Sequence, residues 1–404
     1  MTVSEKPRSV APQAAVSSTL PLIHDTPSLV PETLRETLHI VHVVRQFHPS
    51  TGGLEDVVDF LTKEQIAAGH KVSIVTCDEV FATGERLDAE IICEGRRILR
   101  VPFKGPQKYP LAPAVLRHIT DADLVHVHAI DFFFDFLSAT RLWHRKPLVA
   151  TTHGGFFHTQ DLAVIKKVWF QTLTRISSFG YTRIVGCSQN DTRNFQAVAG
   201  RRVVTVDNGV DIEKFANQAS AEIVPRIVTL GRFSKNKRLD RLIAAMAHLP
   251  AEWQLDIIGA ESDWSASELD AMIAAANVRD RVHIHIRPSN AEIATLMGKA
   301  SFFASASEFE GFGLAVVEAM SAGLIPILEA NPTFADLAAR HDVVQLTQFK
   351  QAEKAAQDVL STHGRAAASK GAMRAEVMER AQLYAWPKVA QNYEAVYAAA
   401  LAER

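Results

Sequence analysis

The run that begins at Glu310 carries the clearest chemical signal in this sequence. Glu310 and Glu318 are both carboxylates, and the segment 314–322 predicts a short buried helix. The residues between Glu310 and that helix are Gly311, Phe312 and Gly313. Glycines before a helix leave backbone N–H groups uncovered at its positive end, where a phosphate can bind. A carboxylate can accept two hydrogen bonds from the vicinal hydroxyls of a sugar or a ribose. The alternative is a glycine loop before an ordinary core helix, because short motifs often occur by chance.

A cationic pair strengthens the first interpretation. Arg232 and Lys237 follow an apolar run that predicts a strand over 227–230. Arginine binds phosphate oxygens through two parallel hydrogen bonds, whereas lysine supplies a compact positive charge. Two such cations just beyond the end of a strand suit a diphosphate leaving group. Together with the glutamates they predict a site for a nucleotide-diphosphate sugar.

Composition sets limits on the class of protein. The chain has 404 residues, which is enough for two domains of ordinary size, and 47% of them are hydrophobic. A formal net charge of −2 argues against nucleic acid as a partner. The three cysteines have no metal-binding spacing and suit a reducing cytosol. We expect no transmembrane helix, and we interpret residues 1–36 as a flexible tail rather than a signal peptide.

Strands and helices are predicted to alternate along the rest of the chain. The pattern begins with a strand at 38–44, a helix at 54–68 and a strand at 71–77, which form a βαβ unit and imply a parallel sheet. Later strands are predicted in two series: 124–128, 148–152, 184–186 and 203–206, and then 227–230, 255–258, 282–286, 302–305 and 324–328. The fold class is therefore α/β, with two Rossmann-like domains joined near 208–211.

These motifs resemble the C-terminal half of retaining GT-B glycosyltransferases of family 4, and the resemblance extends from about Leu38 to about Tyr397. It implies two Rossmann-like domains that face each other across a cleft. The acceptor would bind to domain 37–211 and the nucleotide sugar to domain 212–383. The segment 384–404 would form a helix that crosses back onto the first domain.

Ligands of open α/β sheets bind beyond the carboxyl ends of the strands, so the loops of the first domain also supply candidates. Gly52 and Gly53 follow the first strand and open a helix, where bare amides can face a phosphate. His153 follows the strand 148–152, and the resemblance implies that it contacts the donor sugar opposite Glu310. Ser188 is expected to cap a helix and also matches a family serine near the cleft. Asp131 flanks an aromatic group that could line the acceptor groove.

We expect no metal site. His126 and His128 share one face of a strand, but the sequence shows no convincing third ligand beside them. The pair Asp121 and Asp123 reads as a turn at the end of a helix rather than as a metal-binding motif.

Four segments narrow the resemblance to the α-mannosyltransferases of bacterial exopolysaccharide assembly: 44–50, 152–159, 169–175 and 323–328. That resemblance implies GDP-mannose as donor, polyprenyl-diphosphate-linked cellobiose as acceptor, an α-1,3 linkage, retention of configuration, and no metal or cofactor. Catalysis would rest on His153, Lys237 and Glu310, with Arg232 on the diphosphate and Glu318 on the ribose. The alternatives are a glucosyl- or galactosyltransferase, a nucleotide-sugar epimerase, or an inactive glycan-binding protein.

A basic segment between Arg141 and Arg183 suggests contact with an anionic membrane surface. Within it, 162–176 predicts a helix whose apolar stripe includes Trp169 and Ile176, with Lys166 and Lys167 nearby. The simpler alternative is an amphipathic helix packed on its own sheet. The first interpretation predicts a cytoplasmic protein that binds peripherally to the inner face of the cell membrane.

Overall fold

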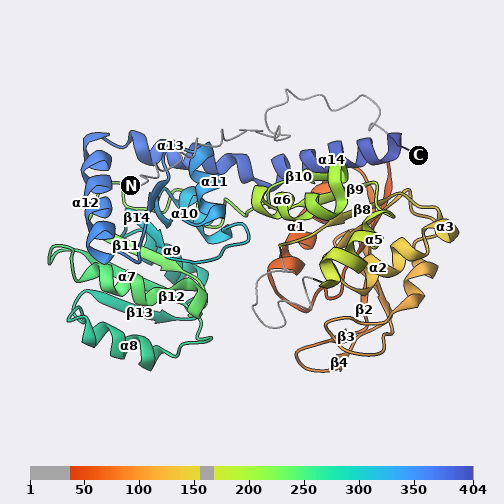
Figure 1. Ribbon diagram of the computed structural model, residues 1–404, viewed down its shortest axis with the longest axis horizontal. Coiled ribbons are helices and arrows are strands. Elements are labelled where there is room, and N and C mark those ends of the chain that lie inside the picture. Colours follow the sequence, from red (N-terminus) through yellow and green to blue (C-terminus); the bar gives the residue numbers. More distant parts are fainter. Residues whose placement is uncertain (1–36, 155–167, 404) are drawn as a thin grey trace, which may run out of the picture.

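Two mainly parallel β-sheets, each covered by helices, form the two lobes of the protein in a computed structural model (Figure 1). The structure describes residues 37–154 and 168–403. The first sheet uses strands between His39 and Thr205, and the second uses strands between Arg226 and Thr347.

The first sheet has the strand order β10-β9-β8-β7-β1-β2-β6-β5. Every neighbouring pair is parallel except β5 and β6, which form an antiparallel pair at one edge. The strands β2, β5 and β6 lie on one side of β1, and the later strands β7 to β10 lie on its other side. The topological switch point therefore lies between β1 and β7. The strands are β1 (His39–Val43), β2 (Lys71–Cys77), β5 (Glu90–Cys93), β6 (Arg96–Val101), β7 (Leu124–His128), β8 (Leu148–Thr151), β9 (Arg183–Gly186) and β10 (Val203–Thr205).

Helices cover both faces of this sheet, as its buried apolar strands require. A short hairpin of β3 (Glu79–Val80) and β4 (Glu85–Arg86) projects from it. The described helices of this lobe are α1 (Gly53–Ala67), α2 (Phe132–Ala139), α3 (Arg141–His144), α5 (Arg175–Ser178) and α6 (Gln189–Ala199).

The second sheet is fully parallel, in the order β13-β12-β11-β14-β15-β16, with its switch point between β11 and β14. Its strands are β11 (Arg226–Leu230), β12 (Gln254–Gly259), β13 (Val282–Ile286), β14 (Phe302–Ser305), β15 (Ile325–Glu329) and β16 (Gln345–Thr347). Its helices are α7 (Leu239–Met246), α8 (Ala266–Ala275), α9 (Asn290–Met297), α10 (Leu314–Ala322), α11 (Pro332–Arg340), α12 (Ala352–Ala368) and α13 (Ala372–Ala381).

The C-terminal helix α14 (Trp386–Ala402) runs back along the first lobe, as predicted (Figure 1). It starts beside the connection between the lobes, where Val210 and Ala385 form an isolated parallel bridge. Its apolar face then joins the core on one side of the first sheet, where Val389, Tyr393 and Tyr397 are buried with residues of β1, β7, β8 and α1. The helix therefore ties the end of the chain to the first lobe.

Most predicted elements appear at or within two residues of their expected bounds. The helix predicted over 162–176 is the exception, and its part before Val168 lies outside the described residues. From Val168 the chain is helical, with a π-helical turn over Phe170–Thr174. Phe170 and Thr174 face the core, whereas Trp169 and Ile176 are exposed, so these two residues of the predicted stripe do not pack on the sheet as the simpler alternative would require. The hairpin β5–β6 was not predicted.

The start of α14 depends on a close approach between backbone and ring, which gives a first prediction. A Cβ added at Gly209 would lie 2.4 Å from two ring atoms of Trp386, which is 5% exposed. We expect Gly209→Ala to lower the free energy of unfolding by about 1–3 kcal/mol, because the ring has to move within a packed core. The apparent midpoint of urea unfolding measures this change.

Gly364 supplies the matched control. It lies inside α12, and a Cβ built there meets no atom within 4 Å. Gly364→Ala should leave the midpoint unchanged or raise it, because alanine favours a helix by up to about 1 kcal/mol over glycine. Equal midpoints for the two variants would show that Gly209 is not needed for the seating of α14.

Candidate active site

The loops at the carboxyl ends of the two sheets line a single cleft of about 640 Å³. From the first sheet come residues that follow β1, β7 and β8, namely Arg45, Gly53, Ala129, Ile130, Thr152 and His153. From the second come residues that follow β11 and β14, namely Gly231, Arg232, Lys237 and the run from Glu310 to Val316. The cleft thus contains the switch points of both sheets, where open α/β folds bind their ligands.

Lys237 and Glu310 meet in this cleft although they are far apart in sequence. Lys237 Nζ lies 2.9 Å from Glu310 Oε2, and both side chains are partly exposed. Gly231 makes room for this arrangement, because a Cβ there would lie 3.2 Å from Lys237 Cε. The cation and the carboxylate are therefore presented together, beside the exposed Arg232.

Asn236 fastens the two loops to each other. Its side-chain Nδ2 donates to the carbonyl oxygen of Phe309 at 2.7 Å, and its Oδ1 accepts from the Phe309 amide at 3.1 Å. The amide of Glu308 donates to the Asn236 carbonyl at 3.0 Å. These bonds hold the loop after β11 against the loop after β14, which fixes the distance between Lys237 and Glu310. Sequence reasoning missed this residue, because a lone asparagine in a loop gives no distinctive signal.

The first turn of α10 opens onto the same cleft. Gly313 precedes the helix with φ of 98°, a left-handed conformation that glycine adopts without strain. A Cβ there would also lie 3.0 Å from Phe334. Gly311 and Phe312 line the cleft, but the Phe312 side chain is buried edge-on against Tyr384, with ring centres 5.6 Å apart. The helix end is therefore suited to holding an anion through backbone N–H groups.

Glu318 lies less directly in the site than the sequence suggested. It is the fifth residue of α10, and it is not among the residues that line the cleft. Its Oε1 lies 3.0 Å from Lys214 Nζ. A ribose would have to share this carboxylate with Lys214.

The first-domain candidates divide into two groups. Gly53 and His153 line the cleft, whereas Gly52, Ser188 and Asp131 do not. Ser188 caps α6, its Oγ accepting from the amide of Asp191 at 3.2 Å, which is the capping role that the sequence indicated. Gly52 precedes α1 as its capping residue.

Asp131 caps α2 by accepting from the amide of Phe133 at 2.9 Å. Burial raises the pKa of its carboxyl to about 7, against the opposing effect of Arg45, whose Nε lies 3.7 Å from Oδ2. Arg45 itself lines the cleft and was missed as a site residue. It lies two residues after the end of β1, so the rule that ligands bind beyond strand ends could have found it.

His153 has a left-handed backbone, with φ of 55°, a conformation that residues other than glycine adopt mainly where function or packing requires it. Burial lowers the pKa of its imidazole to about 4, so the ring is neutral near pH 7. A neutral ring in the cleft suits a hydroxyl better than a phosphate, because it carries no positive charge.

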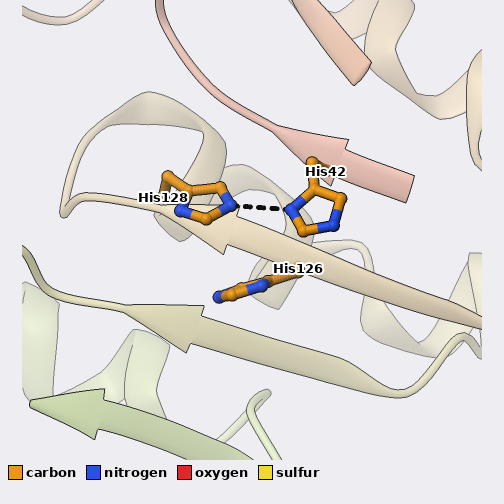
Figure 2. Close-up of side chains that lie close together, drawn as sticks. All are labelled: His42, His126 and His128. Atoms are coloured by element: carbon orange, nitrogen blue, oxygen red, sulfur yellow. Dashed lines mark hydrogen bonds between the residues drawn. The ribbon is translucent and has the colours of Figure 1, made fainter. Parts of the chain in front are cut away.

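His153 contacts a cluster of three histidines through His128. Figure 2 shows the cluster. His42, His126 and His128 are buried, and one ligand-type atom from each lies within 4.8 Å of the others. The expectation that His126 and His128 lack a third neighbour was therefore wrong, since His42 on β1 supplies one. The sequence could not show this, because β1 and β7 become neighbours only in the folded sheet.

Hydrogen bonds nevertheless account for every ring nitrogen in this cluster. His42 bonds to His128 and to Gln65, His128 bonds also to His153, and His126 bonds to Tyr397 and to Thr151. A metal ion would have to displace several of these bonds without gaining a carboxylate or thiolate ligand. The geometry favours a hydrogen-bonded network over a metal centre.

The residues expected to meet a membrane are only partly described. Lys166 and Lys167 lie outside the described residues. Trp169 is 37% exposed and packs edge-on against Tyr109, with ring centres 5.7 Å apart. Within residues 37–154 and 168–403, no helix is both long enough and apolar enough to cross a membrane.

The fold and the cleft are those of a GT-B glycosyltransferase, and comparisons with known proteins support this class. The family description "Glycosyltransferase Family 4" matches residues 51–214, and "Glycosyl transferases group 1" matches residues 211–368. Sucrose-phosphate synthase from Thermosynechococcus elongatus has the same fold, with a TM-score of 0.69 and 18% identity; the match covers 91% of this chain and 100% of that one.

This chain belongs to glycosyltransferase family 4. It is 42% identical over 369 residues to the GDP-mannose:cellobiosyl-diphosphopolyprenol alpha-mannosyltransferase of Komagataeibacter xylinus, a match that covers 90% of this chain and 93% of the relative. The protein of the same name from Xanthomonas campestris is 41% identical over 371 residues, covering 90% and 97%.

Gly53 gives a test of where the donor approaches. It is the first residue of α1 and lines the cleft, and a Cβ built there meets no protein atom within 4 Å. Gly53→Ala should therefore fold normally, while its methyl group occupies space beside the backbone amide. We expect the KM for the glycosyl donor to rise about tenfold, equivalent to about 1.4 kcal/mol of lost binding. Steady-state kinetics measure this, and an unchanged KM would show that the donor does not approach α1.

Proposed function

We propose that this chain transfers mannose from GDP-mannose to polyprenyl-diphosphate-linked cellobiose, with retention of the α configuration, during assembly of an exopolysaccharide repeat unit. The observation that carries this proposal is the cleft in which Lys237 and Glu310 face the loop of His153. The names of the relatives that are 41–42% identical supply the donor base, the sugar and the acceptor.

Charge stabilisation is the main task of the second domain. When the bond between C1 of mannose and the β-phosphate oxygen breaks, negative charge develops on the diphosphate. Arg232, Lys237 and the amides at the start of α10 are placed to bind that charge. Preorganised donors of this kind are commonly worth about 3–4 kcal/mol each, because they need no rearrangement in the transition state.

Bond formation occurs on the face from which the diphosphate leaves. An acceptor hydroxyl oxygen bonds to C1, and its proton passes to the departing β-phosphate oxygen, which balances the charge. Glu310 binds hydroxyls of the donor sugar in this scheme, and Glu318 binds the ribose alongside Lys214. Each step uses groups of this chain and its two substrates, so we propose that transfer needs neither a metal nor a cofactor.

The product assay decides between mannose and other sugars. Purified protein is incubated with polyprenyl-diphosphate-linked cellobiose and, in separate reactions, with GDP-mannose, UDP-glucose or UDP-galactose, and the lipid products are weighed by mass spectrometry. We expect one added hexose with GDP-mannose alone, at the same rate in EDTA. A hexose from a uridine nucleotide, or no product at all, would contradict the proposed donor.

Lys237→Ala tests the proposed charge stabilisation. Turnover should fall about a hundredfold or more, the loss expected for one well-placed donor. Lys235→Ala is the matched control, since Lys235 lies in the same turn but does not line the cleft. Both variants should unfold at the wild-type temperature, and near-native turnover in Lys237→Ala would remove this residue from the catalytic set.

An acceptor carried on a lipid requires the enzyme to reach a membrane surface. We propose that an exposed apolar patch of the first lobe makes this contact, and we call it the Trp143 patch: Leu142, Trp143 and Phe179. These side chains are 84%, 80% and 64% exposed. Leu142 and Phe179 line one shallow hollow, and α3, which carries Leu142 and Trp143, lies at the outer end of the first lobe (Figure 1).

Basic side chains surround this patch. Arg141 and Arg145 line the same hollow, and the guanidinium of Arg202 lies 5.0 Å from the ring centre of Phe179. Basic groups near an anionic leaflet contribute about 1 kcal/mol each, and tryptophan favours the membrane–water interface. This combination favours peripheral binding to anionic lipid. Lys166, Lys167 and Trp169 remain predicted to contribute to the same binding.

Vesicle sedimentation tests the docking surface. The double variant Leu142→Ser/Trp143→Ser should lose most of its binding to anionic vesicles at low salt, whereas Ile92→Ser should not. Ile92 is the matched control, because it is 78% exposed on the edge strand β5 and lies outside the Trp143 patch. Equal pelleting of wild type and the double variant would show that the membrane is met elsewhere, and the joint Lys166→Ser/Lys167→Ser variant then tests the neighbouring segment.

A further inference from the structure

A continuous chain of hydrogen bonds leads from the cleft into the core of the first lobe. His153 Nε2 lies 2.9 Å from His128 Nδ1. His128 Nε2 lies 2.9 Å from His42 Nδ1, and Figure 2 shows this second bond. His42 Nε2 lies 2.7 Å from Gln65 Oε1, and Gln65 Nε2 lies 2.9 Å from the hydroxyl of Tyr397. The chain therefore connects the loop after β8 with β7, β1, α1 and α14 in that order.

Beyond Tyr397 the chain turns back into the sheet. The Tyr397 hydroxyl lies 2.8 Å from His126 Nδ1, and His126 Nε2 lies 2.8 Å from Thr151 Oγ1. Thr151 Oγ1 in turn lies 3.2 Å from the hydroxyl of Tyr393 on α14. This second half begins at Tyr397 and ends at Tyr393, which are both on α14, so the helix contributes two members to the network.

The neutral histidines make this chain directional. A neutral imidazole has one N–H donor and one bare acceptor nitrogen. A ring that accepts a hydrogen bond at one nitrogen must therefore donate from the other. Only two arrangements satisfy every link from His153 to Gln65, and one is the complete reverse of the other. Burial lowers the pKa of His42 to about 4 and the pKa values of His126 and His128 well below 6.5, which keeps these rings neutral.

Gln65 sets the direction in this structure, because its amide presents its acceptor oxygen to His42 and its donor nitrogen to the Tyr397 hydroxyl. Its oxygen faces His42, so His42 must carry its proton on Nε2 and accept on Nδ1. His128 must then donate from Nε2, and His153 must donate from Nε2 to His128. His153 is left with a bare Nδ1.

We propose that Gln65 is a positioning residue that fixes His153 as the tautomer with a bare Nδ1, so that this nitrogen accepts a hydrogen bond from a hydroxyl of the donor sugar. The proposal deepens the proposed function and rests on it for the identity of that sugar. A bare nitrogen accepts from a hydroxyl and repels phosphate oxygens, so the contact would distinguish the sugar end of the donor from its diphosphate end.

Gln65→Met and Gln65→Glu separate this role from simple packing. Methionine removes the acceptor for His42 Nε2–H, and an unpartnered buried donor is costly, so the histidines should reverse together and His153 should carry its proton on Nδ1. Glutamate still accepts from His42, so His153 should keep its wild-type tautomer. The ¹⁵N chemical shifts of histidine-labelled protein distinguish protonated from bare ring nitrogens. The two signals that disappear in His153→Asn are those of the His153 ring nitrogens.

His70→Gln is the matched control for contact with α14. His70 is 7% exposed, and its Nε2 lies 3.1 Å from Glu394 on that helix, but it does not belong to the chain that reaches His153. This variant should leave the His153 tautomer unchanged. A bare Nε2 on His153 in the wild-type protein, or an unchanged tautomer in Gln65→Met, would overturn the role of Gln65, whichever sugar the enzyme uses.

Binding measurements then test the contact with the sugar. In Gln65→Met the KM for GDP-mannose should rise about five- to tenfold, which is the loss expected for one buried hydrogen bond, while the Kd of GDP stays within twofold. GDP lacks the sugar, so a general distortion of the cleft would weaken both ligands. A reversed tautomer with an unchanged KM would disprove the sugar contact. Failure of the wild-type enzyme to use GDP-mannose would overturn the proposed function and leave the tautomer result standing.

Discussion

The site depends on one constraint, which is that the carboxyl ends of two parallel sheets face each other across a single cleft. Each sheet has a switch point at which neighbouring connections run in opposite directions, between β1 and β7 in the first and between β11 and β14 in the second. Loops on the two sides of such a point diverge and leave space for a ligand. Most of the residues that line the cleft come from the segments at both switch points, and the others follow β8 and β9 or lie in the connection between the lobes. Neither sheet alone would bring His153 opposite Lys237 and Glu310.

Polar groups at such a cleft must be held in place without losing their hydrogen bonds. The two sides solve this problem differently. On the second domain, Lys237 and Glu310 neutralise each other at 2.9 Å, and Asn236 fastens their loops through the backbone. On the first domain, the histidines are neutral and pass hydrogen bonds from one ring to the next. A charged pair suits the side that meets a diphosphate, and a neutral network suits the side that meets hydroxyls.

The sequence predicted the local features of this arrangement well and the long-range ones poorly. Strands such as Lys71–Cys77 and the helix Leu314–Ala322 appear at their predicted bounds, because apolar runs and glycines signal them locally. The approach of His42 to His128 could not be predicted, since it depends on which strands become neighbours. The stripe in 162–176 also left open which side of that segment meets the core, because a helical stripe alone does not show this; Phe170 is buried there and Trp169 is exposed.

The helix α14 extends this reasoning to the relation between the domains. Its first residue, Trp386, packs against Gly209 in the connection between the lobes, and its later residues Tyr393 and Tyr397 hold the hydrogen-bond network behind His153. A rigid helix transmits the position of one end to the other. Any movement of the second domain about the connection would therefore act on the same helix that supports the histidine chain. The helix α14 thus supports the active site and also links the connection between the lobes to the first lobe.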